Sequence, residues 1–157
     1  MQPYGPAVLR LVVGSIFLAH GAQKLFGVWG GGGIAGTTTF FSQLGLSPAL
    51  LLAVVVGALE LVGGLLLMAG AFTRVTALAL AADMAVAVWK VHLVNGFFLN
   101  WNIVPGRGHG VEFSLALLGA LIALALGGPG ALSVDGYRER SAETRAYGRS
   151  RLRAGRV

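Results

Sequence analysis

Long apolar runs alternate with short polar or glycine-rich stretches along most of this chain. Four runs come close to the ~20 residues that an α-helix needs to cross a hydrocarbon core of about 30 Å. They cover roughly residues 7–26, 48–72, 75–93 and 111–127. Backbone polar groups must be paired inside lipid, and these Leu- and Ala-rich runs are too long for barrel strands. The pattern therefore predicts an all-α fold, a bundle of four transmembrane helices.

The composition favours a membrane protein over a soluble one. Hydrophobic residues make up 55% of the 157 residues and charged residues only 11%, whereas a soluble domain has about a quarter of its residues charged. The length favours a single domain. We expect a multi-pass protein of the plasma membrane, in contact with the lipid bilayer. Its membrane domain covers residues 1–136, and a mobile basic tail covers 137–157.

The distribution of Lys and Arg predicts the orientation of the chain. Seven of the twelve basic residues lie between Arg138 and Arg156, and Arg74 lies in the short turn between the second and third runs. The loop 27–47 carries no charge. Because basic residues favour the cytoplasmic side, we expect both termini inside and both long loops outside. The tail then anchors the topology and touches anionic lipid, or alternatively binds a partner.

Charged residues within the apolar runs need a structural or functional reason, because one at the bilayer centre costs about 3 kcal/mol on insertion scales. Arg10 is expected to extend to the cytoplasmic surface. Glu60 shares a helical face with two glycines and should point into the bundle. Lys24 and Lys90 either reach the outer interface or line a polar site. The full set is Arg10, Lys24, Glu60, Asp83, Lys90 and Glu112.

Depth places several polar side chains together at the outer end of the bundle, where they predict a pocket roofed by the two long loops. These side chains are His20, Lys24, Lys90, His92 and Glu112. On an ideal helix His92 lies almost opposite Asp83, unless the helix ends or bends near Asn95. His109, beside loop glycines, is expected to be solvated, and residues 30–36 to form a flexible outer loop.

Small residues mark the faces where helices meet. Gly14 and Gly21 lie on the same side of the first run as His20 and Lys24, which should let another helix approach closely. The chain has no cysteine, so thiol catalysis and thiolate metal sites are excluded. No haem, flavin or metal site is evident, and nothing indicates nucleic-acid binding.

Several sequence blocks occur in an order that resembles a known family. They are HGAQKLFG, GTTTFFSQLGLSP, GALELVGGLLLMAGAFTR, VHLVNGFF, G-x-E-F and GGPGALSVD. Over residues 7–136 the chain resembles the DoxX family of small four-helix membrane proteins. That family is similar to the small subunit of thiosulfate:quinone oxidoreductase, and some relatives are linked to complexes that handle thiol and radical stress. The resemblance places His20, Lys24, Glu60, His92 and Glu112 at the family's polar positions.

These observations predict a membrane-embedded, quinone-interacting component of an oxidoreductase or oxidative-stress complex. The expected catalytic residues are His20, Lys24, His92 and Glu112, with the first two donating to a quinone oxygen and the last two relaying protons. The expected quinone-binding residues are His20, Lys24, Glu60, Phe17 and Trp101. A partner oxidoreductase would supply the electrons.

Two other functions remain open at this point. One is a non-catalytic scaffold that recruits oxidoreductases, in which the polar cluster only sets helix register. The other is a small proton-coupled transporter with Glu60 and Asp83 as its titrating pair. Four helices are few for a transporter, so this alternative requires a homo-oligomer.

Overall fold

A computed structural model describes residues 3–154, which form helices and loops without strands. Two helices are long and apolar enough to cross a membrane on their own, α1 (Gly5–Phe26) and α3 (Ala49–Ala69). A third such span, Thr73–Asn95, is a continuous helical segment. It consists of α4 (Thr73–Ala87), a π-helical turn η2 (Val88–His92) and a 3-10 turn η3 (Leu93–Asn95).

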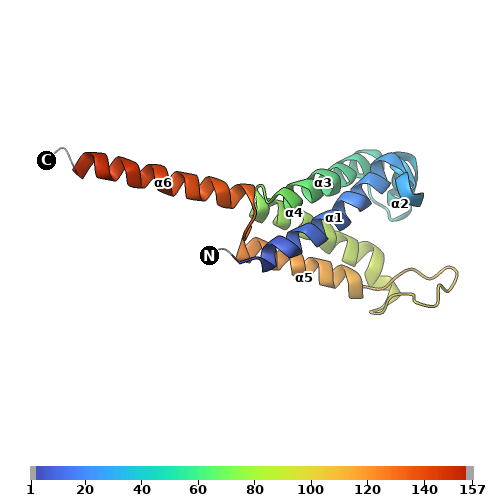
Figure 1. Ribbon diagram of the computed structural model, residues 1–157. Helices are drawn as coiled ribbons and strands as arrows, with labels where there is room; N and C mark the ends of the chain where they lie inside the picture. The colour runs from blue at the N-terminus through green and yellow to red at the C-terminus, as the bar shows by residue number, and fades with distance from the viewer. Residues whose placement is uncertain (1–2, 155–157) are drawn as a thin grey trace.

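The predicted fourth span is helix α5 (Glu112–Gly127), which is apolar but has only 16 residues. At 1.5 Å per residue its length is about 24 Å, less than a typical hydrocarbon core. It packs against α4 and α1 and completes a bundle with α3 (Figure 1). The described part of the chain thus has three candidate membrane spans and a shorter apolar helix, and four full crossings remain a prediction.

The helices run alternately up and down the bundle. The starts of α1 and of α6 (Val134–Ala154) lie at one end, which we call the inner end. Helix α2 (Gly33–Gln43) and the loop 96–111 lie at the other, outer end (Figure 1). The arrangement agrees with both termini on one side, while the cytoplasmic identity of that side remains a prediction. The core between the helices includes Val13, Phe17, Leu67, Leu80, Leu117, Leu121 and Leu124.

Close contact between α1 and α3 depends on glycine, as the sequence predicted. A methyl group on Gly14 would lie 2.7 Å from the carbonyl oxygen of Gly64, and one on Gly64 would lie 2.5 Å from the backbone nitrogen of Leu18. A methyl group on Gly21 would collide with the backbone of Leu61. The helix backbones therefore touch, and the resulting dispersion contacts hold helices together where lipid removes the hydrophobic driving force.

The prediction for Arg10 was wrong, because its side chain is 1% exposed instead of reaching the cytoplasmic surface. Its guanidinium donates to the carbonyl oxygens of Leu67 and Met68 at 3.1 and 3.2 Å, and of Ala131 and Leu132 at 2.8 and 3.2 Å. The first two belong to the last turn of α3, whose carbonyls have no partner within the helix. Arg10 thus ties three segments together at the inner end.

Two more charged side chains at the inner end also cap helices. Arg74 donates to the carbonyl oxygens of Ala125 and Leu126, at 2.9 and 2.7 Å, in the last turn of α5. Asp135 accepts hydrogen bonds from the backbone N–H groups of Phe72 and Thr73, at 2.9 and 2.8 Å, where α4 begins. These contacts satisfy helix-end groups that would otherwise lack partners.

The electrostatics of Asp135 follow from this capping role. Burial opposes the charge of the carboxylate. The N–H groups of Thr73 and Phe72, the Thr73 hydroxyl and the charge of Arg138 nevertheless hold its pKa below the usual range. Asp135 therefore stays ionised and caps α4 at any ordinary pH.

The glycine-rich segment after α1 is not simply a flexible loop. A 3-10 turn η1 (Val28–Gly30) leads into α2, and α2 packs against α1 and α3. The basic tail likewise belongs mostly to a helix, α6, which extends away from the bundle (Figure 1). Whether this tail is mobile, and whether the membrane domain ends at residue 136, remain predictions; residues 155–157 lie outside the described part.

Candidate functional site

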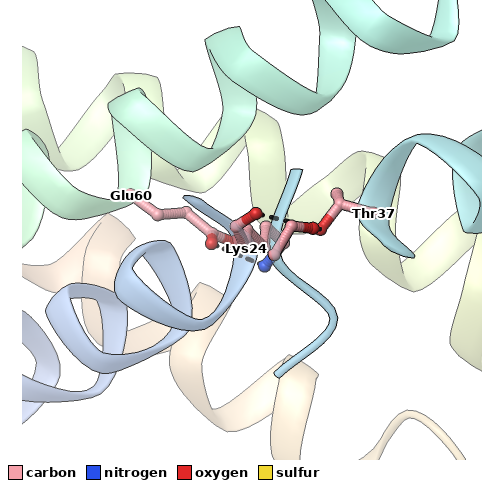
Figure 2. Close-up of polar contacts among 4 residues, drawn as sticks. Lys24, Thr37 and Glu60 are labelled. Carbon is pink, nitrogen blue, oxygen red and sulfur yellow. Dashed lines mark hydrogen bonds and ion pairs between the residues drawn. The ribbon is translucent and has the colours of Figure 1, made fainter. Parts of the chain in front are cut away.

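An ion pair between Lys24 and Glu60 joins α1 to α3 at the centre of the site. The Nζ atom of Lys24 lies 2.5 Å from Oε2 of Glu60, and the two side chains are 25% and 7% exposed. Figure 2 shows the pair beside Thr37 of α2, whose hydroxyl lies 3.3 Å from the carbonyl oxygen of Lys24. Helix α2 thus covers the end of α1 where the lysine is held.

Asp83 of α4 adds a second carboxyl group to this pair. Its side chain lies close enough to interact with both Glu60 and Lys24. Three helices therefore contribute to a lysine–glutamate–aspartate cluster.

A cavity of about 410 Å³ opens beside this cluster, within the range of typical small-molecule sites. Its apolar walls come from α1, α4 and α5 and include Ile16, Met84, Phe113 and Leu117. Five of the predicted site residues lie on it or in its wall. The residues with polar side chains or predicted roles are Phe17, His20, Lys24, Glu60, His92, His109 and Ser114.

The π-helical turn η2 explains how His92 reaches this cavity. At about 100° per residue, an ideal helix places His92 nearly opposite Asp83. A π turn acts as a one-residue insertion and rotates the subsequent residues back by about 100°. His92 then lies on the cavity side of the span. The helical span ends at Asn95, as one of the two predicted alternatives stated, and the π turn lies one turn before that end.

His109 is a cavity residue that sequence reasoning missed. Its carbonyl oxygen lies 3.0 Å from Nδ1 of His92, and its own Nδ1 lies 3.1 Å from the backbone nitrogen of Asn100. The Asn100 side chain in turn bonds to the backbone of Val104 and Arg107. The loop 96–111, which we call the cover loop, is therefore held by internal hydrogen bonds, and Leu99, His109 and Gly110 of this loop line the cavity. The only signal in the sequence was the presence of Asn and His within a glycine-rich loop.

Two predicted site residues lie away from the cavity wall. Glu112 begins α5 and accepts a hydrogen bond from the backbone N–H of Leu99 at 3.0 Å, so it helps to hold the loop. Trp101 lies at the loop tip and is 73% exposed. Lys90 lies 4.3 Å from the ring centre of Trp89. The proton-relay role of Glu112 and the ring-binding role of Trp101 remain predictions.

The described residues contain no group of three His, Cys, Asp or Glu side chains placed to hold a metal ion. The arrangement can donate hydrogen bonds from a lysine and from histidine rings, and can exchange protons through its carboxyl groups. Long apolar helices define a multi-pass integral membrane protein, and they surround a largely apolar cavity that carries a few polar groups.

Comparison with known sequences identifies the family. The DoxX family pattern matches residues 5–93, which is more than half of the chain. The protein belongs to the DoxX family, as the sequence blocks predicted.

Curated relatives agree with a membrane location. A Bacillus subtilis protein named "Putative oxidoreductase CatD" is 33% identical over 133 residues, covering 85% of this chain and 86% of the relative. An uncharacterized membrane protein of Mycobacterium tuberculosis is 34% identical, covering 81% and 77%. The inner membrane protein YqjF of Escherichia coli is 29% identical, covering 86% and 92%. No solved structure matches the chain.

Proposed function

We propose that this protein is the quinone-binding membrane component of an oxidoreductase system. The observation that carries the proposal is the cavity itself, which combines N–H donors from Lys24, His20 and His109 with apolar walls from Phe17 and Phe113. A quinone needs this combination, because its oxygens accept hydrogen bonds and its ring and tail prefer an apolar groove. The name of the B. subtilis relative supports the same reaction class.

Each polar residue has a role in this proposal. The ring of His20 lines the cavity and can donate to a quinone oxygen. Lys24 stabilises negative charge that develops on that oxygen. Glu60 and Asp83 lie beside Lys24, and this cluster relays the two protons that the ring takes up together with two electrons. Electrons come from a partner oxidoreductase.

The same cluster supports a second candidate, proton-coupled transport. Carboxyl groups that lie close together inside a membrane are typical of proton pathways. Transport predicts substrate flux into sealed vesicles that disappears in Glu60→Gln, whereas the quinone proposal predicts no flux.

Photolabelling tests the quinone proposal. Membranes containing the protein are illuminated with an azido derivative of decylubiquinone, and labelled peptides are mapped by mass spectrometry. We expect labelling within residues 16–24 or 109–117, suppressed by excess decylubiquinone and reduced in His20→Ala. Arg107→Gln, an exposed change in the cover loop, serves as the control and should label like wild type. Labelling that resists competition, or that maps only to lipid-facing residues, would contradict the proposal and favour a scaffold.

A further inference from the structure

Hydrogen bonds in the cover loop fix the tautomers of two cavity histidines in opposite senses. A carbonyl oxygen can only accept, so Nδ1 of His92, 3.0 Å from the carbonyl oxygen of His109, must carry a hydrogen. A backbone N–H can only donate, so Nδ1 of His109, 3.1 Å from the Asn100 nitrogen, must carry none. In each neutral ring, the contact at Nδ1 therefore also decides whether the second nitrogen, Nε2, carries a hydrogen.

The consequence is one acceptor and one donor among the residues that line the cavity. In a neutral ring, Nε2 of His92 is an acceptor, because the hydrogen is already on Nδ1. Nε2 of His109 carries its hydrogen and is a donor. Both residues line the same cavity.

A hydroxyl group complements this pair, whereas a carbonyl oxygen does not. A hydroxyl donates its hydrogen to one partner and accepts from another, while a carbonyl can only accept. A carbonyl oxygen between the two rings would face the Nε2 lone pair of neutral His92. Both atoms are acceptors, so no hydrogen bond could form between them. The geometry points to a site that binds the hydroxyl-bearing, reduced form of the quinone in preference to the oxidised form. His92 accepts from the hydroxyl and His109 donates to it.

This inference rests on the proposed quinone function and adds which redox form binds more tightly. His92 and His109 become specificity-determining residues, and Asn100 becomes a positioning residue that acts through His109. Its side chain is buried, and it fixes the loop through Val104 and Arg107. The cover loop therefore sets the hydrogen-bonding character of the site as well as closing it.

Asparagine substitutions test the role of Nε2 separately from that of Nδ1. In His92→Asn the side-chain NH₂ group can still donate to the carbonyl of His109, but the Nε2 acceptor is gone. In His109→Asn the side-chain oxygen can still accept from the Asn100 N–H, but the Nε2 donor is gone. Arg107→Gln, in the same loop, is the matched control. Thermal unfolding in detergent reports whether each variant is folded.

The experiment measures binding of decylubiquinol and decylubiquinone to the purified protein, anaerobically and at pH 8, where an ordinary histidine is neutral. One hydrogen bond corresponds to about a fivefold preference for the quinol in wild type. His92→Asn should abolish that preference by weakening quinol binding alone. His109→Asn should weaken both forms, and the control should behave like wild type.

Three results would overturn the inference. Equal affinity of wild type for the two forms, or a preference for the quinone, refutes it without any variant and leaves the proposed function intact. A His92→Asn variant that is folded and keeps the preference also refutes it. Binding of neither form by wild type refutes the proposed function itself.

Discussion

Removing the ammonium group of Lys24 while leaving the carboxyl group of Glu60 tests the energetics of the cluster. Their closest atoms are 2.5 Å apart, and the Glu60 side chain is 7% exposed. At an effective dielectric constant of about 20, this distance gives an attraction of about 7 kcal/mol. The cost of desolvating both ions offsets much of it. The pair as a whole therefore contributes little, but losing one partner is costly.

The size of that cost can be bounded. In Lys24→Met the buried Glu60 lacks a cationic partner and takes up a proton. Protonating an ordinary glutamic acid at pH 7 costs about 4 kcal/mol, because its pKa is about 4.3 and each unit is 1.36 kcal/mol. We expect the variant to lose about 3–4 kcal/mol of unfolding free energy at pH 7. The loss should shrink to about 1 kcal/mol at pH 5, because proton uptake becomes easier as pH falls.

Reversible unfolding by SDS titration in mixed micelles, at pH 7 and pH 5, measures both values. Asp83 also interacts with Lys24, so the triple variant Lys24→Met/Glu60→Met/Asp83→Asn, which removes both carboxylates as well as the ammonium group, is the control. It should recover most of the lost stability, because no charge is left buried without a partner. A loss below about 1 kcal/mol at pH 7, or an equal loss at both pH values, would show that the pair is not buried as described.

Three further predictions concern the inner end and the helix contact. Arg10→Leu removes a donor from four carbonyl groups, of which that of Leu67 keeps the Gly70 N–H, and should cost about 3 kcal/mol in the same unfolding assay. Arg10→Lys should recover part of this loss. Gly21→Leu places a side chain against the Leu61 backbone and should abolish the monodisperse peak in size-exclusion chromatography, whereas Gly119→Leu, with open space around it, should not. Asp135→Ala should cost about 1–2 kcal/mol at pH 7 as a lost helix cap. Because the pKa of Asp135 is lowered in the folded state, its contribution is present above the unfolded pKa near 4 and lost as pH falls through the lower folded pKa. Wild type and Asp135→Ala should therefore converge in stability in strong acid.

Helical periodicity was sufficient to predict the contacts between regular helices. Gly14 and Gly21 lie on the face of α1 that touches α3, and Glu60 points into the bundle, as their spacing indicated. Depth alone grouped His20, Lys24 and His92 at the outer end, where they share one cavity. These predictions needed only the rise and rotation of an α-helix.

The rest depended on irregular backbone and on long-range partners. A π turn leaves no distinct residue pattern, so its effect on His92 could not be predicted from spacing. Arg10 was expected at the surface because its four acceptors lie in segments far along the chain, at Leu67, Met68, Ala131 and Leu132. His109 acquires its role from the backbone of Asn100 and from His92. Main-chain partners of this kind cannot be read from side-chain types.

The most direct test of the central claim is the quinone content of the purified protein. Protein purified in mild detergent is extracted with organic solvent, and quinone is quantified by absorbance and mass spectrometry. The account predicts about one quinone per folded chain in wild type and a large loss in His20→Ala, with Arg107→Gln unchanged. Absence of quinone from wild type, together with no change in melting temperature when decylubiquinone or decylubiquinol is added, would contradict the account.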